Sequence, residues 1–297
     1  MCPLFADEAD FFYYIKCMDS LDFVEFNDVT FTYPAVEGDV DENGEQIVPK
    51  PIFEHFSASL PKGFVSLVGQ NGCGKSTLML LASGRLKPDS GNVSLLGKDV
   101  FSLGEEEKNL LATVIYQNME FETEDSVESL LSQVYAGGKF AGKAVAIGGT
   151  GDLKDEAIRV FELEGVLNHA LTHLSKGEIQ RVLLAFSVLY GSESIFMDEP
   201  MFAMEEAQKE KSLAYLKEFA RKTNRTIYIA MHELDLTKKF AEKVLLFYPN
   251  RDMSFGTPDE VLTDEELEKA YEIPAALLKK KEDMTREQLA AESAMMR

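Results

Sequence analysis

A glycine-rich stretch that ends in Lys-Ser-Thr carries the clearest chemistry in this 297-residue sequence. The stretch reads Gly69-Gln70-Asn71-Gly72-Cys73-Gly74-Lys75-Ser76-Thr77. Glycines allow a sharp turn that points successive backbone N–H groups at one spot, and the start of a following helix adds positive potential there. Lys75 supplies a full positive charge, and Ser76 offers a hydroxyl suited to Mg²⁺. The spacing therefore predicts a loop that binds the phosphates of a nucleotide.

A second group of polar residues shares one feature, because each follows an apolar run that reads as a strand. They are Gln117 after 111–116, Asp198 and Glu199 after 194–197, and His232 after 226–231. Parallel strands present their carboxyl ends at one edge of a sheet, so we expect these side chains to face one site. Asp198 would hold Mg²⁺, and Glu199 would activate the attacking water as a general base. The alternative is a pair of surface acids in a chain with 51 acidic residues.

The elements that position these residues alternate between strand and helix. A buried strand at 64–68 precedes the glycine-rich stretch, and a helix follows it from residue 78. Further runs predict strands at 23–33, with a turn at Asn27-Asp28, and at 52–60, 92–96 and 243–248, and helices at 152–164, 175–190 and 203–223. We therefore expect an α/β fold with a mixed or parallel sheet flanked by helices, an antiparallel β subdomain and an inserted helical lobe at about 120–174.

The stretch Leu174-Ser175-Lys176-Gly177-Glu178 begins one of these helices and offers free N–H groups to an anion. The same residues also fit a capping box, since Ser175 is followed three residues later by Glu178. Both interpretations can hold together.

In this order and spacing, the motifs resemble those of the ATP-binding-cassette (ABC) ATPases over residues 22–270. The resemblance implies ATP and Mg²⁺ as cofactors, with Tyr33 stacked on adenine, Lys75 and the loop amides on the phosphates, and Ser76, Gln117 and Asp198 around the metal. It also implies catalytic roles for Glu199, Gln117 and His232. Ser175, Gly177 and Glu178 would bind ATP held by a second copy, so two chains would close head-to-tail. Three of these residues also fit purely structural roles: Tyr33 as an inward aromatic, His232 as a helix cap and Gln117 as a polar strand end.

Two places depart from the family pattern. Lys176 and Glu178 stand where the family usually has Gly and Gln, and residues 202–205 read Phe-Ala-Met-Glu instead of Ser-Ala-Leu-Asp. A carboxylate at 178 would repel a γ-phosphate unless it is turned away. We therefore expect slow or partner-dependent hydrolysis.

The C-terminal motifs at 231–235, 255–263 and 267–273 resemble ATPase subunits of importers for siderophores, haem, cobalamin and metal ions. Separate transmembrane permease subunits would then be partners, and the chain would act at the cytoplasmic face of the membrane. The alternatives are a soluble ABC ATPase that acts as a mechanical switch on a protein or nucleoprotein assembly, and a regulatory ATP-binding module. The expected domains are a leader at 1–21, the ATPase at 22–272 and a charged tail at 273–297.

Composition supports these expectations. The formal charge of −21 argues against direct nucleic-acid binding, because phosphate backbones require a positive surface. No apolar run reaches the roughly 20 residues that span a bilayer. Three cysteines and a start without basic residues suggest a reduced cytosolic setting. Cys73 lies in the phosphate loop, so we expect thiol reagents to modify it in a way that MgATP prevents.

Overall fold

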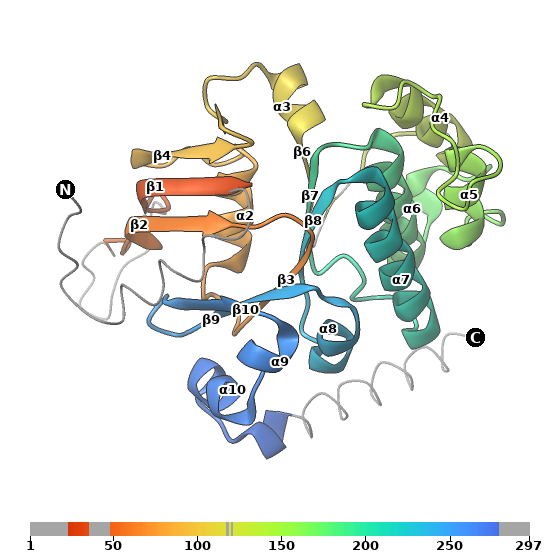
Figure 1. Ribbon diagram of the computed structural model, residues 1–297. Helices are drawn as coiled ribbons and strands as arrows, with labels where there is room; N and C mark the ends of the chain where they lie inside the picture. The colour runs from red at the N-terminus through yellow and green to blue at the C-terminus, as the bar shows by residue number, and fades with distance from the viewer. Residues whose placement is uncertain (1–22, 36–47, 117–118, 120, 279–297) are drawn as a thin grey trace.

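The computed structural model describes residues 23–35, 48–116, 119 and 121–278. Several predictions lie outside these residues: the leader at 1–21, Gln117, and residues 279–297 of the charged tail. Within them the chain forms two sheets and a set of helices (Figure 1). The expected α/β architecture, with an antiparallel sheet and a mixed sheet flanked by helices, is confirmed.

The larger sheet has six strands and determines where the site residues meet. In spatial order they are β10 (Met253–Gly256), β9 (Lys243–Phe247), β3 (Phe64–Val68), β8 (Thr226–Ala230), β7 (Ser194–Asp198) and β6 (Ala112–Ile115). All neighbouring pairs are parallel except β10 with β9. The parallel strands are short, apolar and largely buried, as expected for a sheet covered on both faces.

Alternate residues of the central strands point to different cores. Ile195 and Ile227 belong to the core formed with the helices on one face, whereas Phe196 and Tyr228 belong to the core on the other face. The first core includes α6 (Lys176–Tyr190) and α7 (Glu206–Thr223). The second includes α2 (Lys75–Ala82) and the smaller sheet. Helix α2, which carries the predicted phosphate-binding lysine, is thus held between the two sheets (Figure 1).

The smaller sheet is antiparallel. Its strands, in spatial order, are β2 (Phe53–Leu60), β1 (Val24–Phe31), β4 (Ser90–Leu95) and β5 (Lys98–Asp99). The turn expected at Asn27-Asp28 is wrong, because β1 runs through it as one strand with a shift in register. Asp28 takes φ +53° there, and a Cβ at Gly91 would lie 2.3 Å from the Asp28 carbonyl oxygen. The two strands therefore meet too closely for any residue but glycine at position 91.

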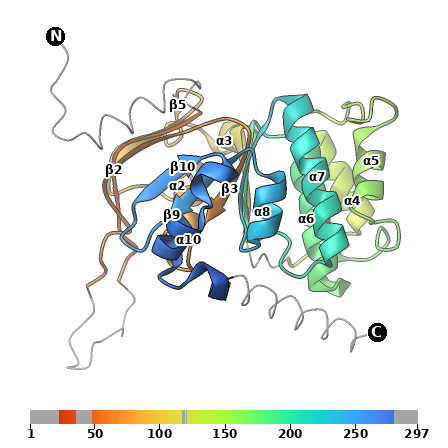
Figure 2. The same cartoon turned by 60° about the horizontal axis from the view of Figure 1, so that its bottom comes forward.

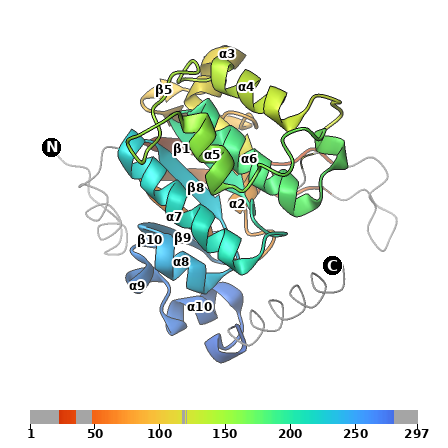
Figure 3. The ribbon, with the colours of Figure 1, turned by 90° about the vertical axis from the view of Figure 1, so that its right-hand side faces the viewer.

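A group of helices packs at one side of the larger sheet (Figures 1 and 3). It contains α4 (Val127–Gly137), α5 (Leu153–Val160) and the short 3₁₀ helix η1 (Leu171–His173), which pack with α6. Ser126 and Asp152 cap α4 and α5. Helix α5 ends before the expected residue 164, since Phe161 leaves the helix and Glu162 has φ +55°.

Other helix boundaries also differ from expectation. Helix α7 starts at Glu206 instead of residue 203, because residues 201–205 form a loop and Glu205 is extended. Helix α3 (Glu105–Leu111) was not predicted, although three acids in its first turn suit a helix start. After β8 come α8 (Leu234–Phe240), α9 (Pro258–Val261) and α10 (Asp264–Tyr271). Helices α9 and α10 pack on β9 at the end of β3 (Figure 1).

Candidate ATP-binding and hydrolysis site

The phosphate-binding loop lies between the end of β3 and the start of α2, as the sequence predicts. Gly69, Gly72 and Gly74 all have positive φ, at 150°, 80° and 108°. A Cβ at Gly69 would lie 2.9 Å from Phe247 Cβ, whereas one at Gly72 would meet nothing within 4 Å. Packing thus requires glycine at 69, while only the backbone conformation favours it at 72. Asn71 and Ser76 are exposed beside the loop.

Lys75 is folded into this loop. Its Nζ donates to the carbonyl oxygens of Gly69 and Gln70, each at 2.8 Å, and lies 3.8 Å from Cys73 Sγ. The side chain is buried, at 6% exposure, so these carbonyls take the place of solvent around the ammonium group. The positive charge of the ammonium group is therefore held at the start of α2, where the helix dipole also favours an anion.

Ser76 and Asp198 come together from α2 and β7. The Ser76 hydroxyl donates to the Asp198 carboxylate, and Asp198 is the last residue of its strand. Burial raises the pKa of Asp198 above its usual value, and the neighbouring Glu199 charge adds to this, while the bond from Ser76 and the charge of Lys75 oppose it. A hydroxyl and a carboxylate beside a phosphate site form an oxygen-rich set, which is the chemistry that Mg²⁺ prefers.

Glu199 and His232 form the second pair at this edge. His232 Nε2 lies 2.6 Å from Glu199 Oε1, in a hydrogen bond that the carboxylate accepts. Glu199 has φ +48°, and its backbone N–H donates to Ala230 at the end of β8. A left-handed conformation is uncommon for a residue with a Cβ, and such residues cluster at functional sites. The strand ends of β7 and β8 thus place a carboxylate next to an imidazole.

Tyr33 reaches the same region from the loop after β1. Its hydroxyl shares a 3.1 Å hydrogen bond with Thr77 in α2, and its ring makes an edge contact with Phe31 at a centroid distance of 4.9 Å. The side chain remains 40% exposed. The aromatic ring of Tyr33 is therefore partly exposed to solvent beside the phosphate-binding loop.

The stretch 174–178 forms a capping box at the start of α6. Glu178 Oε2 accepts hydrogen bonds from the Ser175 amide at 2.8 Å and from the Ser175 hydroxyl at 2.7 Å. These bonds hold the pKa of Glu178 below its usual value. The carboxylate is therefore not turned away from Ser175, because it binds the same groups that the sequence suggested for an anion.

Gly177 has a packing role that the sequence did not reveal. A Cβ at this position would lie 2.7 Å from the Ala203 carbonyl oxygen. Gln180 adds a second contact, since its Oε1 accepts from the Ala203 amide at 2.8 Å. The start of α6 and the 201–205 loop are thus in direct contact, and only glycine permits it. The only sign of this contact in the sequence is the i, i+3 spacing that places Gly177 and Gln180 on one face of the helix.

Two further predicted site residues are Gln117 and Gln70. Gln117 lies outside the described residues, next to the exposed Tyr116 at the end of β6. Gln70 belongs to the loop, but its side chain points elsewhere, since Nε2 donates to the Ala270 carbonyl oxygen of α10 at 3.1 Å. That carbonyl is in the last turn of the helix and has no partner within it. Gln70 thus caps a helix 200 residues away in the sequence.

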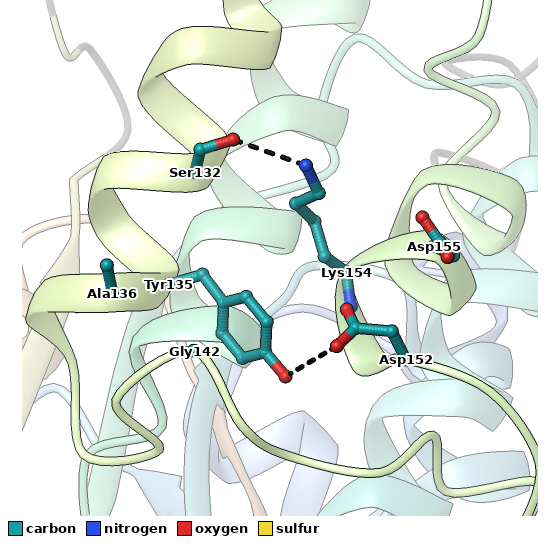
Figure 4. Close-up of a pocket in the computed structure, with 7 residues that line it drawn as sticks. All are labelled: Ser132, Tyr135, Ala136, Gly142, Asp152, Lys154 and Asp155. Atoms are coloured by element: carbon teal, nitrogen blue, oxygen red, sulfur yellow. Dashed lines mark hydrogen bonds between the residues drawn. The ribbon is translucent and has the colours of Figure 1, made fainter.

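A cavity of about 430 Å³ lies elsewhere, between α4 and α5 (Figure 4). Its lining includes Ser132, Tyr135, Asp152 and Lys154. Lys154 Nζ pairs with Glu128 at 2.6 Å, and the Tyr135 hydroxyl lies between the Ala144 carbonyl and Asp152. Because these polar groups satisfy one another, we assign no binding role to the cavity.

Comparison with known proteins agrees with this geometry. The profile described as ABC transporter matches residues 53–202, which is about half of the chain. The chain is 28% identical over 277 residues to the energy-coupling factor transporter ATP-binding protein EcfA2 of Methanospirillum hungatei, a match that covers 86% of this chain and 60% of that protein. It is 28% identical over 235 residues to the iron(3+)-hydroxamate import ATP-binding protein FhuC of Bacillus subtilis, covering 76% of this chain and 84% of FhuC.

The fold is also shared with solved structures. An ATP-binding subunit of an ABC transporter superposes with a TM-score of 0.65 and 20% identity, covering 87% of this chain and 98% of that one. The chain therefore belongs to the ABC transporter family. Among the described residues, every helix is too short or too polar to cross a bilayer.

Proposed function

We propose that this chain binds and hydrolyses ATP for an importer whose membrane permease is made of other chains. Support comes from relatives named as ATP-binding proteins of import or energy-coupling factor systems. We further propose a homodimer that closes on ATP, and action at the cytoplasmic face of the membrane. The proposed ATPase domain is 22–272, with a helical subdomain at about 120–174.

The observation that carries the proposal is the meeting of two polar pairs with Lys75 at one sheet edge. Ser76 with Asp198, and Glu199 with His232, lie at the ends of adjacent parallel strands and the start of α2. Such an edge is where α/β proteins bind their ligands.

Each group then has a defined task. Lys75 would exchange the Gly69 and Gln70 carbonyls for the β- and γ-phosphates. Glu199 would accept the proton of the attacking water, while His232 orients the carboxylate through their 2.6 Å bond and reaches the γ-phosphate. Tyr33 would stack on adenine.

Ser76 and Asp198 are the residues that would hold Mg²⁺, with Gln117 as a third ligand. This set of oxygen donors with a single carboxylate fits Mg²⁺, which proteins usually bind through one or two carboxylates together with substrate phosphates. When bound, the ion supplies positive charge that neutralises the phosphates during transfer.

Completion of the site by a second copy would require Ser175, Gly177 and Glu178 to approach the partner's nucleotide. A Glu199→Gln variant tests this idea, because it keeps the side-chain shape while removing the base. We expect the variant to bind MgATP, to lose hydrolysis and to form a dimer that light scattering detects. Glu210→Gln, which changes an exposed glutamate of α7 paired with Lys239, is the matched control and should behave like the wild type.

The result that contradicts the proposal is a Glu199→Gln protein that hydrolyses ATP at the wild-type rate, or one that stays monomeric in saturating MgATP. Purification of the ATP-trapped protein from membranes tests the importer assignment. Recovery of permease subunits supports it, whereas recovery of ribosomes or a soluble complex supports the mechanical-switch alternative.

A further inference from the structure

A part-buried ion pair, between the buried Lys209 and the partly exposed Glu233, joins α7 to the residue that follows His232. Lys209 Nζ lies 2.5 Å from Glu233 Oε1, and the side chains are 7% and 29% exposed. Helices α7 and α8 pack beside each other (Figures 2 and 3), and Glu233 is the N-cap residue of α8. The pair therefore bridges two elements at the loop that carries the catalytic histidine.

Burial makes this pair unusual among the lysines. Three described lysines are buried: Lys75, Lys108 and Lys209. Lys75 belongs to the phosphate-binding loop, and Lys108 pairs with Glu105 one turn earlier on its own helix. A buried ammonium is costly unless it is paired, and removal of one partner leaves the other charge uncompensated. The position of Glu233 is therefore tightly coupled to Lys209.

The loop between β8 and α8 has three residues, 231–233, and is held at both ends. At one end, Ala230 lies in the sheet and accepts the Glu199 amide. At the other end, Lys209 holds Glu233. His232 lies between these two anchors, with Nε2 2.6 Å from Glu199 Oε1.

Helix α7 connects this anchor to another part of the molecule. It begins directly after the 201–205 loop, and the Lys209 amide donates to Glu205 in the first turn at 2.9 Å. The 201–205 loop in turn contacts the start of α6 through Gln180. A displacement of the 201–205 loop would therefore move the first turn of α7, and with it Lys209 and its partner Glu233.

We infer that Lys209 is a positioning residue for ATP hydrolysis, which holds the 231–233 loop so that His232 faces Glu199 and the γ-phosphate. Through α7, it couples the orientation of His232 to the 201–205 loop. The inference rests on the proposed roles of Glu199 and His232. Lys209 pairs with Glu233 and is not among the proposed nucleotide-binding residues, so its loss should affect turnover more than ATP binding.

The test compares Lys209→Met with Lys209→Arg and with Lys211→Met. Lys211 is the matched control, because it lies on the same helix and pairs with Glu162 at 2.8 Å, away from His232. We expect Lys209→Met to lower kcat at least about tenfold while KM and the affinity for a fluorescent ATP analogue change less than about twofold. Lys209→Arg should restore most of the rate, and Lys211→Met should match the wild type.

Two results would overturn the inference. One is a Lys209→Met kcat within about twofold of the wild type. The other is an equal loss of turnover and nucleotide affinity that Lys209→Arg does not restore, which indicates a purely structural role. If Lys209→Met proves unstable, the double variant Lys209→Met with Glu233→Gln removes the uncompensated charge. The inference then requires that this double variant also lowers kcat at least about tenfold while KM changes less than about twofold.

A second measurement separates this inference from the proposed function. If the wild type and Lys211→Met both lack turnover, the proposed function fails. Amide exchange in 231–234 then tests the anchor, because Lys209→Met should accelerate it and Lys211→Met should not. Unchanged exchange in Lys209→Met contradicts the inference.

Discussion

The carboxylate of Glu178 would compete with the γ-phosphate of the partner's ATP for Ser175. We therefore expect Glu178→Gln to change stability and ATP-dependent dimerisation in opposite directions. The carboxylate accepts from both the amide and the hydroxyl of Ser175. The variant removes the charge and retains an acceptor of the same shape. We expect it to be slightly less stable than the wild type and yet to dimerise more tightly on MgATP.

The magnitudes follow from the geometry. A phosphate oxygen bound to the Ser175 hydroxyl would lie about 5 Å from the Glu178 carboxylate, from two hydrogen-bond lengths. At that distance, two unit charges repel by roughly 1 kcal/mol in water, and the exposure of the start of α6 makes this lower limit appropriate. A head-to-tail dimer has two such sites, so the gain is about 2 kcal/mol, or roughly thirtyfold in the dimer Kd.

Stability should change in the opposite direction. Weakening the capping box costs roughly 0.5–1 kcal/mol, which lowers Tm by about 1–3 °C for a chain of this size. Because the folded pKa of Glu178 is depressed, its contribution is present above the ordinary value of 4.5 and is lost as pH falls through the folded pKa. The difference in unfolding free energy between wild type and variant should therefore shrink in acid and be full at pH 7.

Sedimentation velocity in saturating MgATP measures the dimer Kd, with both proteins in the Glu199→Gln background to prevent turnover. Glu260→Gln is the matched control, since Glu260 forms the same capping box with Thr257 at the start of α9. It should lose similar stability without tightening the dimer. A Glu178→Gln dimer no tighter than its parent would refute the competition argument.

Three further predictions use other contacts of the site. Gly177→Ala should lower Tm, because its Cβ would lie 2.7 Å from a backbone oxygen, whereas Gly165→Ala, with nothing within 4 Å, should not; equal melting curves would contradict this. Gln70→Ala should accelerate amide exchange in the last turn of α10 by removing its cap, and unchanged exchange would show that the cap is dispensable. Cys73, at 7% exposure, should react slowly with maleimide, and at least about fivefold more slowly when MgATP is present. Equal reaction rates with and without MgATP would contradict protection by the nucleotide.

Local chemistry explains what the sequence predicted correctly. Glycine readily adopts the positive φ angles seen at Gly69, Gly72 and Gly74, so the local sequence alone favours the turn of the phosphate-binding loop. Strand ends follow from apolar runs, which is why Asp198 and Glu199 were expected at one sheet edge. The capping role of Ser175 likewise depends on residues three apart.

Only the tertiary structure decided how side chains far apart in sequence pair with one another. The bond of Gln70 to α10, the contact of Gly177 with the 201–205 loop and the ion pair of Lys209 with Glu233 each join separate elements. Their partners depend on how helices pack on the sheet, which no local pattern encodes. The same is true of β1, where Asn27-Asp28 favours a turn in isolation, but two neighbouring strands hold it as a bulge.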